Sequence, residues 1–362
     1  MVCLFLRLLK SVGRQLLPNA MTSEGLRFPQ TAIFELTYRC NHRCLFCSCP
    51  WEAPSCSYEK GTELTLEEWR KAIDRLQTLG VKTLSISGGE ALLKDSLLDI
   101  LGYIRSKGCF NTDVPIVLIS NGLLMNEAFL EAFKKYNVHL SMSLPGLDTF
   151  EWHTGVDNAS GVLRWFEEAK RLGVPTTVNV TVTKRNYHEL YRTLAEGLLA
   201  GADTVLLNRF LPGGRGLANI DELTLDTDQL RGMLDTAEEV LELAGRRGAV
   251  GTEFPRCIIK NPEKYTHLRV ASVCAAAKEF FVIDPSGKVR TCNHSPRVVG
   301  HIFHPQVVAD VEYWNIFARR EYIPTSCVSC NEVNYCDCGC REAAAIVHGD
   351  VCAKDVCFDN NE

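Results

Sequence analysis

Residues 31–38, Thr-Ala-Ile-Phe-Glu-Leu-Thr-Tyr, are followed after one arginine by Cys40-Asn-His-Arg-Cys44-Leu-Phe-Cys47. The first stretch is rich in apolar and β-branched residues, which is typical of a buried strand. The second places three cysteines within eight residues. Clustered thiols in a reducing compartment indicate metal or iron–sulfur ligation rather than disulfides. A metal centre is therefore predicted where the first strand ends.

The same order of strand and helix continues along the chain. We expect strands at residues 31–38, 83–87, 115–120, 138–144, 176–183 and 203–210. Between them, helical periodicity predicts helices at residues 65–79, 95–107, 126–136, 161–172 and 186–199. Thr65 and Glu68 have the spacing of a capping box at the start of the first of these helices. Six such repeats with short connections predict an α/β fold, a parallel sheet curled into a partial (β/α)6 barrel resembling a TIM barrel.

Unusual local sequences follow the expected strands. After the cysteine loop they are Ser87-Gly-Gly-Glu90, Ser120-Asn-Gly122, Ser143-Leu-Pro-Gly146, Thr183-Lys-Arg-Asn186 and Leu211-Pro-Gly-Gly214. The C-terminal ends of parallel strands meet at one rim, where barrels of this type place their ligands and chemistry. We therefore expect the active site at that rim.

The composition excludes several classes of protein. The chain has 362 residues, 46% hydrophobic and 23% charged, with a net charge of −5, which rules out a disordered chain. The acidic balance argues against nucleic acid as a partner. No apolar run reaches the roughly 18 residues of a membrane span, and residues 1–17 read as a short amphipathic helix rather than a signal peptide. We expect a cytoplasmic protein.

The cysteines also divide the chain. Seventeen are present, and nine of them lie between Cys274 and Cys357 in a turn-rich region. We expect this region to be organised around metal clusters rather than a large apolar core. The predicted domains are an N-terminal extension at 1–30, the barrel at 31–215, a helical linker at 216–254 and a cysteine-rich domain at 255–362.

The spacing Cys-x3-Cys-x2-Cys, with Phe46 before the last cysteine, resembles the radical SAM superfamily over residues 31–215. The resemblance implies that Cys40, Cys44 and Cys47 hold a [4Fe–4S] cluster whose open iron binds S-adenosylmethionine (SAM). Reduction of bound SAM then yields methionine and a 5′-deoxyadenosyl radical. The alternative for this loop is a zinc site or unligated thiols.

Further SAM contacts follow from the same resemblance. Gly88, Gly89 and Glu90 are expected at the methionine ammonium, although a Gly pair after a strand is otherwise only a tight turn. The other expected contacts are Phe46, Ser143, Arg164 at the carboxylate, and Asn179 and Leu211 at the ribose and adenine. The alternative for Arg164 is a solvated helix residue. The family often has Ser-x-Asp-Gly after the fourth strand, whereas this chain has Pro145.

The C-terminal cysteines are similar, spacing for spacing, to the SPASM extension of radical SAM maturases, including a hairpin that turns at 285–287. The resemblance implies two auxiliary [4Fe–4S] clusters, the first held by Cys274, Cys292 and Cys340. Ligands of the second are Cys327, Cys330, Cys336 and Cys357. Cys257 is the expected fourth ligand of the first cluster, with a free thiol or an open iron as alternatives. Zinc is the rival metal.

Several further cysteines lie beside these ligand sets. Cys338 and Cys352 are substitutes for the C-terminal ligands. Cys49 and Cys56 are loop thiols or hydrogen-atom donors to a substrate radical.

The predicted function is a three-cluster radical SAM oxidoreductase that abstracts hydrogen from a peptide or protein side chain. We expect a flavodoxin- or ferredoxin-type electron donor. One alternative is an epimerase or dehydrogenase of a small molecule such as a sugar or aminocyclitol. Another is formylglycine formation, although sulfatase maturases have an Asp where this chain has Asn293. The non-enzymatic alternative is an iron–sulfur carrier or zinc scaffold.

Overall fold

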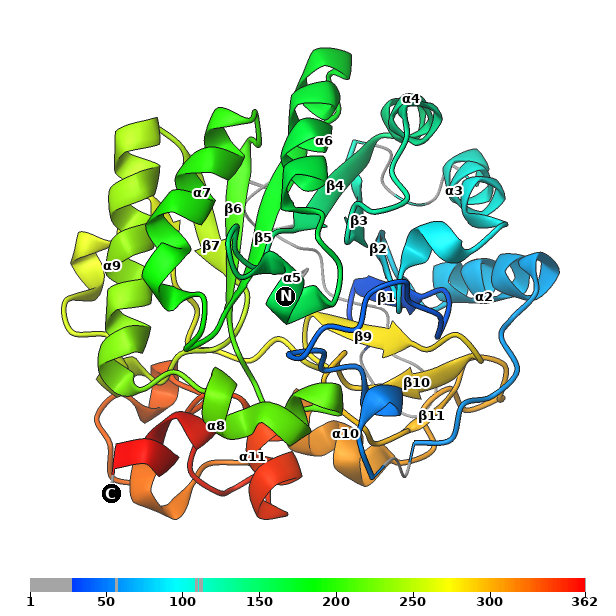
Figure 1. Ribbon diagram of the computed structural model, residues 1–362. Helices are drawn as coiled ribbons and strands as arrows, with labels where there is room; N and C mark the ends of the chain where they lie inside the picture. Colours follow the sequence, from blue (N-terminus) through cyan, green and yellow to red (C-terminus); the bar gives the residue numbers. More distant parts are fainter. Residues whose placement is uncertain (1–27, 56–57, 108–109, 111–112, 362) are drawn as a thin grey trace.

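A computed structural model describes residues 28–55, 58–107, 110 and 113–361. The expectations placed on residues 1–17 and on Cys56 lie outside this part of the chain. Figure 1 shows a curved sheet with helices around its outside and the C-terminal segment, orange to red, at one end.

Six parallel strands form the centre of the sheet. They are β1 (Thr31–Glu35), β2 (Thr83–Ser87), β3 (Ile116–Ser120), β4 (Val138–Ser143), β5 (Thr176–Val182) and β6 (Thr204–Arg209). Each pairs in parallel with the next in sequence, as the βα repeats predicted. Nearly every residue of these strands is buried, because helices cover one face and the barrel interior covers the other.

Two short strands that were not predicted extend this sheet beyond β6. They are β7 (Arg247–Val250) and β8 (Leu268–Arg269), both parallel to their neighbours. The partial barrel expected in an α/β fold is confirmed, and it continues past the sixth strand.

The outer helices follow the predicted periodicity. The longer ones are α2 (Leu66–Thr78), α3 (Leu97–Ser106), α4 (Glu127–Lys135), α6 (Ala159–Leu172), α7 (Leu190–Leu199) and α9 (Thr227–Ala244). The capping box of α2 is present, with the Thr65 hydroxyl accepting from the Glu68 amide at 3.3 Å. The apolar face of α2 packs on β1, where the Trp69 and Phe34 rings lie 4.8 Å apart. Two shorter helices lie at the rim, α5 (Phe150–Thr154) and α8 (Ile220–Leu223).

The C-terminal region joins the same sheet through a hairpin. β9 (Phe280–Ile283) and β10 (Lys288–Arg290) pair antiparallel, and β9 also pairs in parallel with β1. With β11 (Gly300–His301), the strands of the described residues form one 11-stranded sheet. The helices α10 (Val311–Ala318) and α11 (Arg341–His348) complete this region. The hairpin was predicted from its sequence, but its pairing with β1 was not.

A membrane-crossing helix is not found in the described part of the chain, where no helix is both long and apolar enough to span a bilayer.

Candidate active site

The loop of residues 40–47, here called the cluster loop, leaves β1 at the rim and is held by backbone hydrogen bonds on two sides. The amides of Arg43 and Leu45 each donate at 2.8 Å to carbonyls of α5, those of Thr154 and His153. The Cys47 carbonyl accepts from the Gly216 amide at 3.1 Å. The three thiols are therefore fixed by the backbone around them.

The thiols of the cluster loop interact with one another. The pKa of the Cys40 thiol is raised to about 11, mainly by burial and to a smaller extent by the nearby Glu90 and Cys47. Burial, followed by Cys47 and Cys40, raises the pKa of Cys44 well above its usual value. A metal or cluster would supply the positive charge that holds such buried thiols as thiolates. A set of three sulfur donors in one loop fits an iron–sulfur cluster.

Gly88 and Gly89 pack against the segment that leads into the cluster loop. The Gly89 amide donates to the Thr37 carbonyl, and the Glu90 amide to the Arg39 carbonyl, both at 2.8 Å. A Cβ atom on Gly89 would lie 2.1 Å from the Arg39 carbonyl oxygen, so only glycine fits this position. The Gly pair therefore lies beside the cluster loop.

Glu90 is buried, and its carboxylate is bonded to the protein. It accepts from the Asn121 amide at 2.8 Å, the Ser120 hydroxyl at 2.9 Å and the Leu92 amide at 3.0 Å. The Asn121 side chain in turn donates to Asn41 in the cluster loop at 2.7 Å. A carboxylate has about four acceptor positions, so one remains for a ligand donor. Glu90 thus joins the loops after β1, β2 and β3.

A central cavity of about 270 Å³ lies inside the rim. Four predicted SAM contacts line it, namely Phe46, Ser143, Asn179 and Leu211. Cys47 and Cys49 from the cluster-loop side line it too, as do Cys274, Cys292 and Cys340 from the C-terminal region. The cavity therefore brings the cluster loop, the strand ends and three expected auxiliary ligands together.

Asn208, which the sequence reasoning missed, also lines the central cavity. Its amide nitrogen donates to the Asn179 carbonyl oxygen at 2.8 Å. Its own carbonyl oxygen is buried and has no hydrogen-bond partner among the described residues. A buried acceptor without a partner is costly, so a ligand donor fits here. The available signal was an asparagine directly after the apolar residues 205–207 of β6.

Arg164 lies outside the central cavity. It is exposed on α6, with its guanidinium 4.6 Å from the centre of the Trp165 ring. Arg215, which the sequence reasoning missed, contacts the cluster loop instead. It donates to the Cys44 carbonyl at 3.1 Å and pairs with Glu52. The Gly-rich run after β6 was the available signal, because glycines there let the backbone approach the cluster loop.

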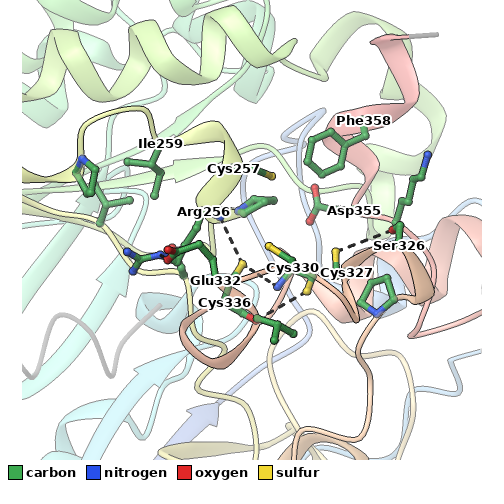
Figure 2. A pocket seen from close by; sticks show the side chains of 18 of the residues that line it. Arg256, Cys257, Ile259, Ser326, Cys327, Cys330, Glu332, Cys336, Asp355 and Phe358 are labelled. Atoms are coloured by element: carbon green, nitrogen blue, oxygen red, sulfur yellow. Dashed lines mark hydrogen bonds and ion pairs between the residues drawn. The ribbon is translucent and has the colours of Figure 1, made fainter.

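The remaining expected ligands lie in a second hollow of about 860 Å³. Figure 2 shows Cys327, Cys330 and Cys336 here, together with Cys257. Cys338 also lines this hollow, and Cys357 is buried nearby. Among the described residues, no three Cys, His, Asp or Glu side chains are grouped as a single metal ion would require. The thiols instead line two hollows.

Two buried aspartates hold the backbones of expected ligands. The Asp355 carboxylate accepts hydrogen bonds from the amides of Cys340 at 2.7 Å and Cys357 at 3.0 Å. It also forms a bidentate ion pair with the Arg209 guanidinium of β6, with distances of 2.6 and 2.8 Å. Asp337 accepts from the Cys274 amide at 2.6 Å. Sequence reasoning missed both, because aspartates are common in turns for other reasons.

Comparison with known proteins shows what the chain resembles. Residues 34–196 match the Radical SAM superfamily. The PqqA peptide cyclase of Granulibacter bethesdensis is 27% identical over 90% of this chain and 86% of its own length. The PqqA peptide cyclase of Rhodopseudomonas palustris is 26% identical over 93% and 88%.

Solved structures share the fold. Streptococcus suis SuiB was solved with S-adenosylmethionine and with the precursor peptide SuiA. Its structure with S-adenosylmethionine has a TM-score of 0.66 at 16% identity, and the match covers 91% of this chain and 76% of SuiB. The structure of anSMEcpe with bound AdoMet has a TM-score of 0.66 at 16% identity, covering 87% of this chain and 90% of that one.

Proposed function

We propose, from the match of residues 34–196 to the Radical SAM superfamily, that the chain is a member of this superfamily and modifies a side chain of a ribosomally made peptide. It is an enzyme that uses S-adenosylmethionine and a [4Fe–4S] cluster. When bound, these cofactors supply a 5′-deoxyadenosyl radical that abstracts hydrogen from a C–H bond. The proposed ligands of this cluster are Cys40, Cys44 and Cys47. Residues 255–362 are proposed to hold two auxiliary clusters.

The central cavity carries the proposal. Cys47 and the three thiols Cys274, Cys292 and Cys340 line the same cavity. Cys47 would contribute to holding one cluster at this cavity, and Cys274, Cys292 and Cys340 would hold an auxiliary cluster that would supply an electron acceptor on its other side. Phe46 contributes an apolar wall to this cavity, which would limit the water beside a reactive intermediate. Ser143 and Asn179 offer polar contacts that orient SAM.

The peptide substrate class is supported by the relatives. Two similar proteins that cover about nine-tenths of this chain are named PqqA peptide cyclases. The fold is also that of SuiB, which was solved with a precursor peptide. We propose a flavodoxin- or ferredoxin-type electron donor and a cytoplasmic location, because the many clustered thiols need a reducing compartment.

Formylglycine formation fits this cavity less well. Asn293 lines the cavity at the position where sulfatase maturases have an Asp, and its amide donates to Glu35 at 3.1 Å. Glu35 is buried and paired with Arg290. An aspartate at 293 would place a second carboxylate against Glu35, which is unfavourable without another cation. The asparagine is therefore suited to Glu35 rather than to a base.

The test is anaerobic incubation of the reconstituted protein with SAM, dithionite and the short peptides encoded beside its gene. We expect 5′-deoxyadenosine and a peptide of altered mass, with the changed residue located by fragmentation. The matched control is the Cys40→Ala variant, which should give neither product. Formation of 5′-deoxyadenosine with a sugar or aminocyclitol, and with no peptide, would contradict the peptide proposal.

A further inference from the structure

The turn that carries Cys257 is attached to the loop that carries Cys327, Cys330 and Cys336. Cys257 lies in the 3-10 helix Arg256–Ile258. The backbone amide of Arg256 donates to the sulfur of Cys336 at 3.4 Å. The Arg256 guanidinium pairs with Glu332 of the same loop at 2.6 Å. These two contacts hold the turn over the second hollow.

The thiol of Cys257 shares that hollow with the other three. Figure 2 shows Cys257, Cys327, Cys330 and Cys336 around one space, with the three loop cysteines opposite the turn. Cys338 lines the same hollow. Cys274, Cys292 and Cys340 line the central cavity instead. The geometry therefore separates Cys257 from the expected first auxiliary ligands.

We infer that Cys257 completes the ligand set of the second auxiliary cluster with Cys327, Cys330 and Cys336. Four thiolates are the full complement of a [4Fe–4S] cluster. This differs from the family pattern, which implies Cys357 as the fourth ligand, and from the expectation that Cys257 serves the first cluster. Cys274, Cys292 and Cys340 are then the only cysteines of the described residues that line the central cavity on the C-terminal side. The inference rests on the iron–sulfur part of the proposed function.

Thiol alkylation tests the inference without any peptide substrate. The full chain is reconstituted anaerobically, treated with iodoacetamide under native conditions and digested, and modification of Cys257 is measured by mass spectrometry. Cys257 is exposed, so it should react in the iron-free protein. We expect protection after reconstitution in the parent and in a Cys274→Ala/Cys292→Ala variant. In a Cys327→Ala/Cys330→Ala variant we expect Cys257 to react.

Protection in the Cys327→Ala/Cys330→Ala variant, or reaction in the reconstituted parent, would overturn the inference. Iron analysis is the second measurement. Adding Cys257→Ala to Cys274→Ala/Cys292→Ala should remove about four more irons, whereas adding it to Cys327→Ala/Cys330→Ala should remove none. The opposite result would assign Cys257 to the first cluster. A third result is that the iron content of Cys274→Ala/Cys292→Ala stays the same when Cys257→Ala is added and falls when Cys357→Ala is added instead. That result would assign the fourth position to Cys357. A parent without iron would refute the proposed function itself.

Discussion

Replacing Asp355 by asparagine should destabilise the protein more than a typical single substitution. The carboxylate and its partner Arg209 are almost completely buried, with side chains 0% and 2% exposed. Burial alone raises the pKa of Asp355, but attraction and hydrogen bonds from Arg209, with a bond from Cys357, outweigh it, and the pKa is lowered. A carboxylate with a lowered pKa in the folded state stabilises at any pH above its unfolded pKa of about 3.9. At neutral pH the full contribution is present.

The magnitude follows from what the substitution leaves behind. Asp355→Asn keeps the side-chain shape but leaves the Arg209 charge buried and unpaired, which costs about 3–5 kcal/mol of unfolding free energy. Asparagine also has one acceptor oxygen instead of two, so the amide of Cys340 or of Cys357 loses its partner. Because both amides belong to expected cluster ligands, iron content should fall with stability.

The assay is anaerobic urea unfolding of the reconstituted protein, followed by circular dichroism, with iron analysis of the same samples. Adding Arg209→Met to Asp355→Asn removes the unpaired charge, so the double variant should be more stable than Asp355→Asn alone. The control is Glu168→Gln in the exposed pair with Arg171, which should have no measurable effect. A loss below about 1 kcal/mol for Asp355→Asn, with unchanged iron, would refute the reasoning.

Three further predictions concern the cluster loop and the barrel. Gly89→Ala would place a Cβ 2.1 Å from a backbone oxygen, so it should abolish iron binding at the cluster loop and SAM cleavage. The control is Gly173→Ala, where φ is +75° and a Cβ atom would meet no other atom within 4 Å. This variant should keep iron binding and SAM cleavage and lose only about 1 kcal/mol of unfolding free energy. Equal iron content in the two variants would contradict the prediction. Arg215→Gln removes a cation beside the cluster loop, so the midpoint potential of that cluster in an EPR-monitored titration should become more negative. Glu52→Gln removes an anion, so the midpoint potential of the same cluster should become more positive, and the potentials of the auxiliary clusters serve as the internal control. Shifts of the same sign in the two variants would refute the electrostatic role. Burial lowers the pKa of His139 to about 3. Below about pH 6.5 this imidazole is protonated in the unfolded chain but stays neutral in the folded protein. The free energy of unfolding therefore falls by about 1.4 kcal/mol for each pH unit below that value. Between about pH 7 and about pH 5.5, unfolding free energy should fall less in His139→Gln than in the parent, and an equal fall would count against the buried neutral ring.

The repeating part of the fold was predictable because its signals are local. The six central strands are short apolar runs, and the helices between them have a clear period and capping residues such as Thr65. β7 was missed because its four residues include a glycine and carry little periodicity. The pairing of β9 with β1 joins residues about 250 positions apart, and no local pattern encodes such a contact.

The residues of the candidate site were also predictable only where their sequence signals are local. The spacing of the cysteines in residues 40–47 is a local pattern, and four residues expected at SAM do line the central cavity. Arg164 was expected at the SAM carboxylate from the family resemblance, but it lies exposed on α6 beside Trp165. Arg215 and Asp337 act through contacts with distant backbone, and Asp355 pairs with the distant Arg209, so their residue types alone gave no signal. The grouping of Cys257 with Cys336 likewise depends on the folded chain.

The most direct test of the central claim is the formation of 5′-deoxyadenosine from SAM by the anaerobically reconstituted protein with dithionite. We expect the parent to produce it, and a Cys40→Ala/Cys44→Ala/Cys47→Ala variant, which should lose about four irons, to produce none. No 5′-deoxyadenosine from the fully reconstituted parent, or an undiminished amount from the triple variant, would contradict the claim.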